Sequence, residues 1–330
     1  MRVLIIGGTG FLSSALVEAA VAEGHDVTIL TRGQRPVEVP SAVRRLTADR
    51  QDEAAFRAAV GGQRFDAVLD AICYTPQHAQ QNIEVFAGQV GRLVMISTDF
   101  VYTVGPRPLP IPEETPRDAP TDYGRNKAAA EDRLLAANDR LPVTILRPPH
   151  VIGAGGLFGT GSLQGRDAAL PARLRRGEPI LLLDGGALLI QPVDRADIAA
   201  ASLAVLKAPA TAGQAYNMAG PQAVPTRRYY EIIADILGVE LRVACLPSEV
   251  YLAAYPERVS FARHRVYSHD KLFRDAGFRP ARPLEASLRE MWAWLEANPP
   301  AGADAPATET EKALLALLAE RDARALELLR

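Results

Sequence analysis

A tyrosine and a lysine stand four residues apart in the run Tyr123-Gly124-Arg125-Asn126-Lys127. This i, i+4 spacing puts both side chains on one face of a helix. A phenol has an ordinary pKa of about 10, and a nearby ammonium favours its anionic form, so the pair is typical of a site that donates and accepts protons. An ordinary surface pair is the alternative. The position of the run between two expected strands favours the catalytic interpretation.

Two hydroxyl side chains, Ser97 and Thr98, end the expected strand that precedes this pair. The carboxyl end of a parallel strand borders the crevice in which such sheets bind ligands, and a hydroxyl there can hydrogen-bond a substrate oxygen. We take Thr98 as the catalytic hydroxyl, with capping of the following turn as the alternative. Asp99 and Phe100 follow on the same rim, where contact with substrate competes with turn capping for Asp99 and with plain packing for Phe100.

Glycines fill the turn between the first expected strand and the first expected helix, in residues 7–13 (GGTGFLS). They let the backbone approach a pyrophosphate, whose charge then lies at the free N–H groups and positive dipole end of the helix. Ser13 stands where a third glycine is usual, and its small side chain suits that packing position. The sequence therefore predicts a dinucleotide site here, with a plain tight turn as the alternative.

The end of the second expected strand distinguishes the two nicotinamide dinucleotides. An acidic side chain there would accept the ribose 2′-hydroxyl of NAD, whereas this chain has Thr31 and Arg32, with Arg35 close by. A guanidinium pairs bidentately with a 2′-phosphate, so we favour NADP; NAD, with Arg32 as a solvated loop cation, is the alternative. Asp49, after the third expected strand, is placed to contact the adenine amino group.

Three further side chains border the expected crevice. Tyr74 is placed to stack on substrate or to pack against its neighbours, and His150 to hydrogen-bond substrate or to sit in a turn without a role. Asp70 ends the fourth expected strand and faces the cofactor or an acid-base site. No spacing of His, Cys, Asp and Glu in the sequence resembles a metal site.

The elements that would position these residues alternate between short apolar runs and helical periodicity, which is the signature of parallel βαβ units. The expected strands are residues 3–6, 27–30, 43–46, 67–71, 92–96 and 143–146. The expected helices between them are residues 13–22, 53–60, 77–86 and 125–137. The strands are apolar at nearly every position, so the sequence predicts an α/β fold with a doubly wound parallel Rossmann sheet covered on both faces.

After Pro148 this alternation breaks, which predicts a smaller, discontinuous carboxyl-terminal substrate domain. We expect a dinucleotide-binding Rossmann domain from residues 1–150 plus about 187–217, because 187–191 and 195–206 restore the strand-then-helix order, and a substrate domain from about 151–186 and 218–298. Residues 301–307 form a linker, and 308–330 an appended amphipathic helix. Its leucine stripe must dock on its own subunit or on a partner, and we favour a homodimer.

Composition limits the classes of function. A chain of 330 residues suffices for about two domains, and 48% hydrophobic with 23% charged residues is ordinary for a globular protein. A net charge of -2 provides no overall positive field, so neither nucleic acid nor a membrane is an expected partner. Cys73 and Cys245 are too few for a disulfide framework and suit a cytoplasmic location. We expect no secretion leader and no membrane span.

Together these motifs resemble the extended short-chain dehydrogenase/reductases, also called NAD-dependent epimerase/dehydratase proteins. The resemblance covers about residues 1–298, and its motifs are residues 7–12, 66–71, 96–98, 101–102, 123–127, 145–148, 191–199 and 216–217. It implies a catalytic set of Thr98, Tyr123 and Lys127. The tyrosine would exchange a proton with a substrate hydroxyl or carbonyl while a hydride passes to or from C4 of the nicotinamide, whose ribose Lys127 would reach.

On this basis the predicted cofactor contacts are Gly7, Thr9, Gly10, Phe11, Leu12, Arg32, Asp49, Arg50, Asp70, Ala71, Tyr123, Lys127 and Pro148. The predicted substrate contacts are Tyr74, Asp99, Phe100 and His150.

Two departures from the family bear on the substrate. Similar enzymes that act on nucleotide sugars often carry an arginine shortly before the segment equivalent to 197–199 and an asparagine after Pro149, whereas this chain lacks arginine in 187–192 and has His150. The chain looks more like the atypical branch of the superfamily. We therefore expect an oxidoreductase or epimerase acting on a hydroxyl or ketone of a sugar-like or other small polar substrate. The alternative is a cofactor-sensing regulatory or RNA-associated protein, which would not need Tyr123 and Lys127.

Overall fold

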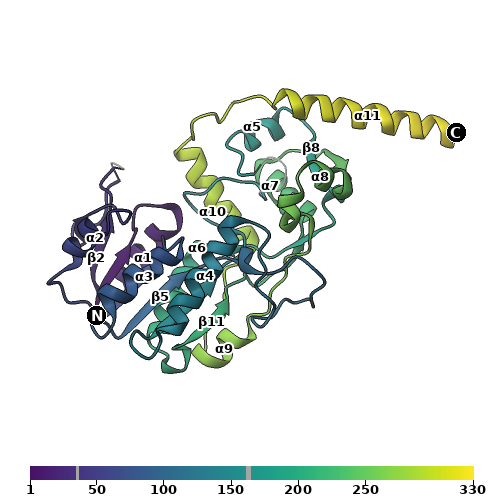
Figure 1. The fold of residues 1–330 in the computed structure, drawn as a ribbon. Helices are drawn as coiled ribbons and strands as arrows, with labels where there is room; N and C mark the ends of the chain where they lie inside the picture. Colours follow the sequence, from purple (N-terminus) through teal and green to yellow (C-terminus); the bar gives the residue numbers. More distant parts are fainter. Residues whose placement is uncertain (35–36, 161–164) are drawn as a thin grey trace. The chain divides into compact units, whose positions relative to one another are not determined.

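The computed structural model describes residues 1–34, 37–160 and 165–330, and the chain divides into two compact units (Figure 1). Unit 1 comprises Met1–Val151, Val193–Pro221 and Tyr267–Arg282, and unit 2 comprises Ile152–Pro192, Gln222–Val266 and Pro283–Arg330. Among the described residues, none of the helices combines the length and the apolar character needed to span a bilayer.

Unit 1 is built on a seven-stranded parallel sheet with the strand order β11-β6-β5-β4-β1-β2-β3. The strands are β1 (Arg2–Ile6), β2 (Asp26–Thr31), β3 (Arg44–Thr47), β4 (Ala67–Asp70), β5 (Arg92–Ile96), β6 (Val143–Arg147) and β11 (Gln214–Asn217). The chain starts at β1 and winds outward in both directions, so the order reverses between β1 and β4. A crevice for ligands opens at such a switch point, outside the carboxyl ends of the strands.

Helices cover both faces of this sheet because successive strand residues point to opposite sides. Val3 and Ile5 of β1 pack in one hydrophobic core with α1 (Phe11–Ala22) and α6 (Arg195–Leu206). Leu4 and Ile6 pack in the other core, with α2 (Glu53–Val60), α3 (Pro76–Phe86) and α4 (Asp122–Ala136). The predicted doubly wound α/β fold is confirmed.

The chain returns to unit 1 twice. The first return begins with β10 (Val193–Asp194) and leads through α6 to β11. The second contains α9 (Asp270–Ala276), and it was expected to belong to the substrate domain. Tyr267 forms a β-bridge with Ile111, and the Tyr216 hydroxyl donates to Asp275 at 2.9 Å. These contacts join residues far apart in sequence, so no local pattern indicated them.

Residues 187–191 do not return to the sheet, and that expectation was wrong. They contain β9 (Leu189–Ile190), which pairs antiparallel with β12 (Val224–Pro225) inside unit 2. Two residues are enough to pair with this short partner but too few to form a core strand of a parallel sheet. The seventh strand of the sheet is β11 instead.

Unit 2 has its own core, formed by helices around a two-stranded parallel sheet of β8 (Ile180–Leu183) and β13 (Val243–Leu246). The chain enters this unit at β7 (Val151–Ile152). Its helices are α5 (Leu170–Arg175), α7 (Thr226–Leu237), α8 (Ser248–Ala254), α10 (Leu284–Ala297) and α11 (Glu309–Leu329). Apolar side chains of α7 and α10, such as Ile233 and Leu288, pack on Ile180 and Leu182 of β8.

Candidate active site

The carboxyl end of β5 holds two hydroxyl groups with different partners. Ser97 Oγ donates a 2.5 Å hydrogen bond to Glu131 Oε1 of α4, which keeps that hydroxyl occupied inside the protein. Thr98 Oγ1 donates to Asp99 Oδ1 at 3.3 Å and accepts from the Phe100 N–H at 3.3 Å, so it caps the turn after β5, and it also lies near enough to Tyr123 to lower the pKa of that phenol. The arrangement therefore favours Thr98 over Ser97 as the catalytic hydroxyl.

Tyr123 lies in the first turn of α4, whose N-cap residue Thr121 accepts a hydrogen bond from the Gly124 N–H at 3.2 Å. A Cβ at Gly124 would lie 2.2 Å from the Phe100 carbonyl oxygen, so only glycine lets this turn approach the segment after β5. The Tyr123 ring packs edge-on against the Phe100 ring, with centroids 6.3 Å apart, and the side chain is 45% exposed. Its phenol is held beside Thr98 and stays open to a ligand.

Desolvation raises the pKa of Tyr123 to about 12, because it disfavours the phenolate. The neighbouring Tyr74 and Asp99 side chains raise it further, and the hydrogen bond with Thr98 opposes them. The pKa is thus above its ordinary value, contrary to the expectation that the Lys127 ammonium lowers it: desolvation has the largest effect, and the side chains that act on this pKa are Tyr74, Thr98 and Asp99. Tyr123 is therefore protonated at neutral pH and ready to donate a proton.

Lys127 lies one helical turn after Tyr123 and is 1% exposed. Its Nζ donates a 2.8 Å hydrogen bond to the Ile96 carbonyl oxygen at the end of β5, and lies 4.9 Å from the centroid of the Tyr74 ring. Desolvation lowers the pKa of this ammonium. The carbonyl and the aromatic face both stabilise the buried cation, so its position relative to β5 is fixed.

The turn between β1 and α1 has the backbone of a phosphate-binding loop. Gly7 and Gly8 have φ angles of +114° and +110°, which L side chains rarely adopt, and a Cβ at Gly8 would lie 2.7 Å from Ile29 Cγ2. The first N–H groups of α1 lack partners within the helix and face this turn. The turn and the first turn of α1 contain the predicted contacts Gly7, Thr9, Gly10, Phe11 and Leu12. The residues present therefore fit a pyrophosphate.

The ends of β2 and β3 carry the residues predicted to select the cofactor. Arg32 follows β2 directly and is exposed, while Arg35 lies outside the described residues. Asp49 lies two residues after β3, and its Oδ1 accepts a 3.0 Å hydrogen bond from the Gln51 N–H. The guanidinium of Arg32 is thus accessible to a phosphate from solvent.

Arg50 and Asp70, both predicted to contact the cofactor, bind each other in the interior. Arg50 Nη1 donates to both Asp70 carboxylate oxygens, at 3.0 and 2.9 Å, and the two side chains are 4% and 0% exposed. Arg50 Nη2 donates to Asn82 Oδ1 at 3.2 Å, and Asn82 Nδ2 donates to Asp70 Oδ2 at 2.6 Å. Burial alone would raise the pKa of Asp70, but the Arg50 charge and these hydrogen bonds lower it. Only the backbones of these two residues are left to contact a cofactor.

Ala71 follows β4, and Pro148 and His150 follow β6, so these residues lie at the carboxyl edge of the sheet on either side of β5. A Cβ at Gly7 would lie 3.8 Å from Ala71 Cβ, so Ala71 borders the phosphate loop. The Pro148 carbonyl accepts a 3.2 Å hydrogen bond from the Asp99 N–H, which joins the end of β6 to the end of β5. His150 is buried, with 6% of its surface exposed.

The carboxylate of Asp99 is held by hydrogen bonds to other side chains of unit 1. It is 4% exposed, and its Oδ2 accepts a 2.7 Å hydrogen bond from the Tyr267 hydroxyl. The Tyr267 ring is stacked on the Tyr102 ring, with centroids 6.1 Å apart. With Asp99 Oδ1 beside Thr98 Oγ1, this geometry favours holding Thr98 over the predicted contact with substrate.

A buried ion pair beneath the site was not singled out from the sequence. Glu131 is fully buried and accepts hydrogen bonds from Arg147 Nε at 3.1 Å and Arg147 Nη2 at 2.6 Å. Arg147 Nη1 donates to the Tyr102 hydroxyl at 2.9 Å. Glu131 lies four residues after Lys127, so the helical spacing that relates Tyr123 to Lys127 was the signal that could have found it.

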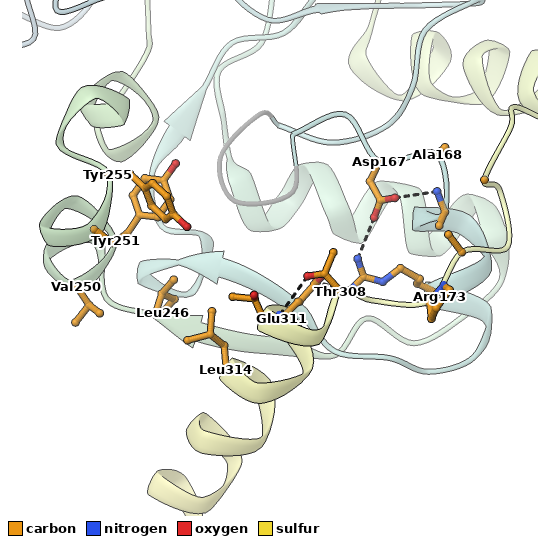
Figure 2. A pocket seen from close by; sticks show the side chains of 16 residues that line it. Asp167, Ala168, Arg173, Leu246, Val250, Tyr251, Tyr255, Thr308, Glu311 and Leu314 are labelled. Carbon is orange, nitrogen blue, oxygen red and sulfur yellow. Dashed lines mark hydrogen bonds and ion pairs between the residues drawn. The ribbon is translucent and has the colours of Figure 1, made fainter.

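A cavity of about 710 Å³ in unit 2 contains none of the predicted site residues (Figure 2). It lies among α5, α8, the segment before α11 and the first turns of α11. Among the residues described in both units, no group of three or more His, Cys, Asp or Glu side chains is arranged to hold a metal ion.

The strand order and the phosphate loop after β1 define a nicotinamide-dependent oxidoreductase or epimerase with a Rossmann domain. The chain belongs to the NAD dependent epimerase/dehydratase family, whose sequence profile matches residues 3–219. The resemblance recognised in the sequence is thereby confirmed.

Named relatives and solved structures agree with this assignment. The 2′-dehydrokanamycin reductase of Streptomyces kanamyceticus is 29% identical over 76% of this chain and 70% of its own. The chloroplast stem-loop binding protein of 41 kDa b of Arabidopsis thaliana is 25% identical over 68% of this chain and 60% of its own. The crystal structure of a putative epimerase from Burkholderia cenocepacia J2315 superposes with a TM-score of 0.71 at 25% identity, covering 90% of this chain and 98% of that one.

Proposed function

We propose that the protein reduces a ketone, or oxidises the corresponding hydroxyl, on a sugar-like or other small polar substrate, with NADP(H) as the preferred cofactor. The supporting observation is that Thr98 lies beside the phenol of Tyr123 and affects its pKa, one helical turn from the buried ammonium of Lys127. A proton donor and a second hydroxyl are thereby held on rigid elements. Redox-neutral epimerisation would use the same residues and is the alternative within the family.

In the reductive direction Tyr123 donates its proton to the carbonyl oxygen as negative charge develops there. Its raised pKa, about 12, keeps the phenol protonated at neutral pH. Thr98 stabilises the same oxygen by hydrogen bonding. The nicotinamide, when bound, supplies the hydride at its C4. Oxidation of a hydroxyl requires the deprotonated form of Tyr123, which accepts the proton of the substrate hydroxyl as the hydride leaves.

Lys127 is proposed to bind the nicotinamide ribose while it holds the end of β5. An ammonium has three N–H donors, and one of them is used by the Ile96 carbonyl. The remaining proposed cofactor contacts are the phosphate-loop residues, Arg32, Asp49, Ala71, Pro148, and the backbones of Arg50 and Asp70. Arg32 is proposed to pair with the 2′-phosphate, because it is exposed at the end of β2 with no carboxylate in its place.

We propose that the substrate contacts the exposed aromatic side chains of the site. Tyr74 and Tyr123 are each 45% exposed, and Phe100 packs against Tyr123. His150 is the proposed hydrogen-bonding contact at the end of β6. Because a relative is named a reductase of a dehydro compound, we favour reduction as the physiological direction.

A cofactor and carbonyl assay tests this function. The purified protein is incubated with NADPH or NADH and a panel of keto sugars and small polar ketones, and loss of the reduced cofactor is followed by absorbance. We expect turnover with NADPH, and freely exchanging cofactor. A tightly retained NAD that does not exchange would indicate epimerase chemistry, and no turnover with any carbonyl would contradict the reductase.

A second candidate is an RNA-associated protein, favoured only by the relative named as a stem-loop binding protein. Net charge -2 argues against a strong phosphate-binding surface. Titration with a labelled RNA stem-loop separates the two functions, since RNA binding should not depend on the hydroxyl of Tyr123.

We also propose that the protein self-associates as a homodimer and resides in the cytoplasm. Four leucines of α11 are more than half exposed, which favours association: Leu317, Leu326, Leu328 and Leu329. The exposed thiol of Cys245 suits a reducing compartment.

A further inference from the structure

The helix α11 docks on its own unit through its first turns only. Glu311 and Leu318 are each 6% exposed, and Leu314 and Leu315 between them are partly buried. The carboxylate of Glu311 forms an ion pair with Arg173 of α5, which is 3% exposed. The sequence had left open whether this helix docks on its own chain or on a partner, and its first three turns dock on its own chain.

The second half of α11 has no covering within its own chain, since every residue from 319 to 330 is exposed. Leu328 and Leu329 are 81% and 84% exposed. Leu328 lies on the same side of the helix as Leu314 and Leu317, because these positions recur at three- and four-residue steps through Arg321. This side of the helix is therefore partly covered at Leu314 and open to water at Leu328. Figure 1 shows the second half of α11 extending beyond the other elements of unit 2.

An open apolar cavity lies beside the docked half. Its volume of about 710 Å³ is in the range of ligand-sized pockets. Figure 2 shows Leu314 of α11 facing Leu246 of β13, with Tyr251 and Tyr255 of α8 and its C-terminal end along the opposite wall. Val250 and Tyr255 at this wall are 53% and 38% exposed. Unit 2 thus presents an uncovered helix end and a mostly apolar cavity, with Asp167, Arg173 and Glu311 among its polar lining residues.

We propose that the α11 helices of two copies pack antiparallel about a two-fold axis near Arg321, so that Leu328 and Leu329 of each copy enter the cavity of the other. Leu314 and Leu328 each lie seven residues from Arg321, or about 10 Å along the helix at 1.5 Å per residue. Antiparallel packing therefore puts Leu328 opposite the partner's Leu314, which lines the cavity. This interface presupposes the self-association proposed above and names the surface responsible.

The charges near the axis are compatible with this arrangement. Arg321 forms an ion pair with Asp322 of the same helix at 2.8 Å, so the charge of Arg321 is balanced within each copy. The contact is isologous and closes with two copies, because each copy contributes one helix end and one cavity. An apolar helix end lying in an apolar groove is a common mode of recognition.

Light scattering on the full chain tests the interface. We expect the double variant L328D/L329D, and separately Val250→Asp on the cavity wall, to halve the mass of the native assembly. The matched control is Ala323→Asp, since Ala323 is exposed and lies about 120° or more around the helix from both Leu328 and Leu329, and the mass of this variant should not change. A native chain that is already monomeric overturns both this interface and the proposed self-association. An assembly insensitive to all these variants overturns the interface alone.

Cross-linking tests the position of the axis. In a Cys245→Ser background, which leaves only the buried Cys73, Arg321→Cys puts a thiol where identical residues of two copies meet. A short bis-maleimide should link Arg321→Cys into dimers and leave the control Ala319→Cys, on the opposite side of the helix, unlinked. Equal linking of the two variants, or none, overturns the two-fold arrangement. Reductase activity per subunit should be native in every variant, since α11 contributes no residue to the site.

Discussion

The ends of β4 and β5 lie side by side at the same edge of one sheet, but the polar side chains at these two ends differ in how accessible their surroundings are to a ligand. Asp70, at the end of β4, is closed in by Arg50 and Asn82 and is fully buried. Thr98, after β5, is also hydrogen-bonded, to Asp99 and to the Phe100 N–H, but it lies beside Tyr123, which is 45% exposed. A position at the carboxyl edge therefore does not by itself give a residue a chemical role. The decisive property is whether the side chain borders a group that a ligand can reach.

Substitution of Tyr123 by phenylalanine should have the largest effect on activity. It removes the proton donor while the ring and its packing on Phe100 remain, so we expect kcat to fall by about 100-fold or more. The dissociation constant of the cofactor should be nearly native, as measured by quenching of protein fluorescence. A variant that keeps most of its turnover would contradict the proposed mechanism.

A substitution at the buried Arg50–Asp70 pair, at the end of β4, should reduce the stability of the protein. Arg50→Met leaves Asp70 buried without its cation, so we expect the free energy of unfolding to fall by about 3–5 kcal/mol in urea titrations. The control is Arg2→Met: Arg2 of β1 pairs with Asp66, which precedes β4, and because the two side chains are 45% and 41% exposed this pair should contribute far less to stability. Equal losses of stability in the two variants would contradict the expectation that the buried ion pair contributes more than the exposed one.

The pH dependence of this stabilisation has a definite sign. The pKa of Asp70 is lowered in the folded protein, so its contribution is full above the unfolded value of about 3.9 and is lost as the pH falls through the folded value. The stability difference between the native protein and Arg50→Met should therefore narrow in acid and not between pH 6 and 8.

Local pattern was enough to predict six of the seven strands of the sheet, the glycine turn after β1 and the spacing of Tyr123 and Lys127, but not β11. It placed Arg50 and Asp70 at the correct edge, but their pairing joins residues 20 positions apart and depends on how β4 packs against the segment after β3. The raised pKa of Tyr123 could not be predicted, because the sequence does not show that burial has the largest effect on it. The hydrogen bond from Tyr267 to Asp99 joins residues 168 positions apart, so no local pattern in the sequence could have indicated it.

A further prediction concerns Arg32, the exposed residue that follows β2. Arg32→Ala should weaken NADPH binding by about ten- to a hundredfold, the effect of losing a charged bidentate pair, and leave NADH binding unchanged. Parallel titrations with the two cofactors measure this. If the native protein binds both equally well, the preference for NADP is wrong, whatever the variant does.

The smallest expected effect is at Asp99, which links the open site to the interior. Its carboxylate raises the pKa of Tyr123 and lies 3.3 Å from Thr98 Oγ1, so Asp99→Asn removes a negative charge and keeps the shape. The pKa of Tyr123 should then fall, and the basic limb of kcat/KM for ketone reduction should move to lower pH, because the donor loses its proton earlier. At neutral pH we expect only about a fivefold loss of kcat/KM, equivalent to one hydrogen bond of about 1 kcal/mol. Tyr267→Phe is the matched control: it removes the 2.7 Å donor to Asp99 but retains the carboxylate charge, so its basic limb should not move to lower pH. An unmoved limb in Asp99→Asn would show that the Asp99 charge does not act on Tyr123.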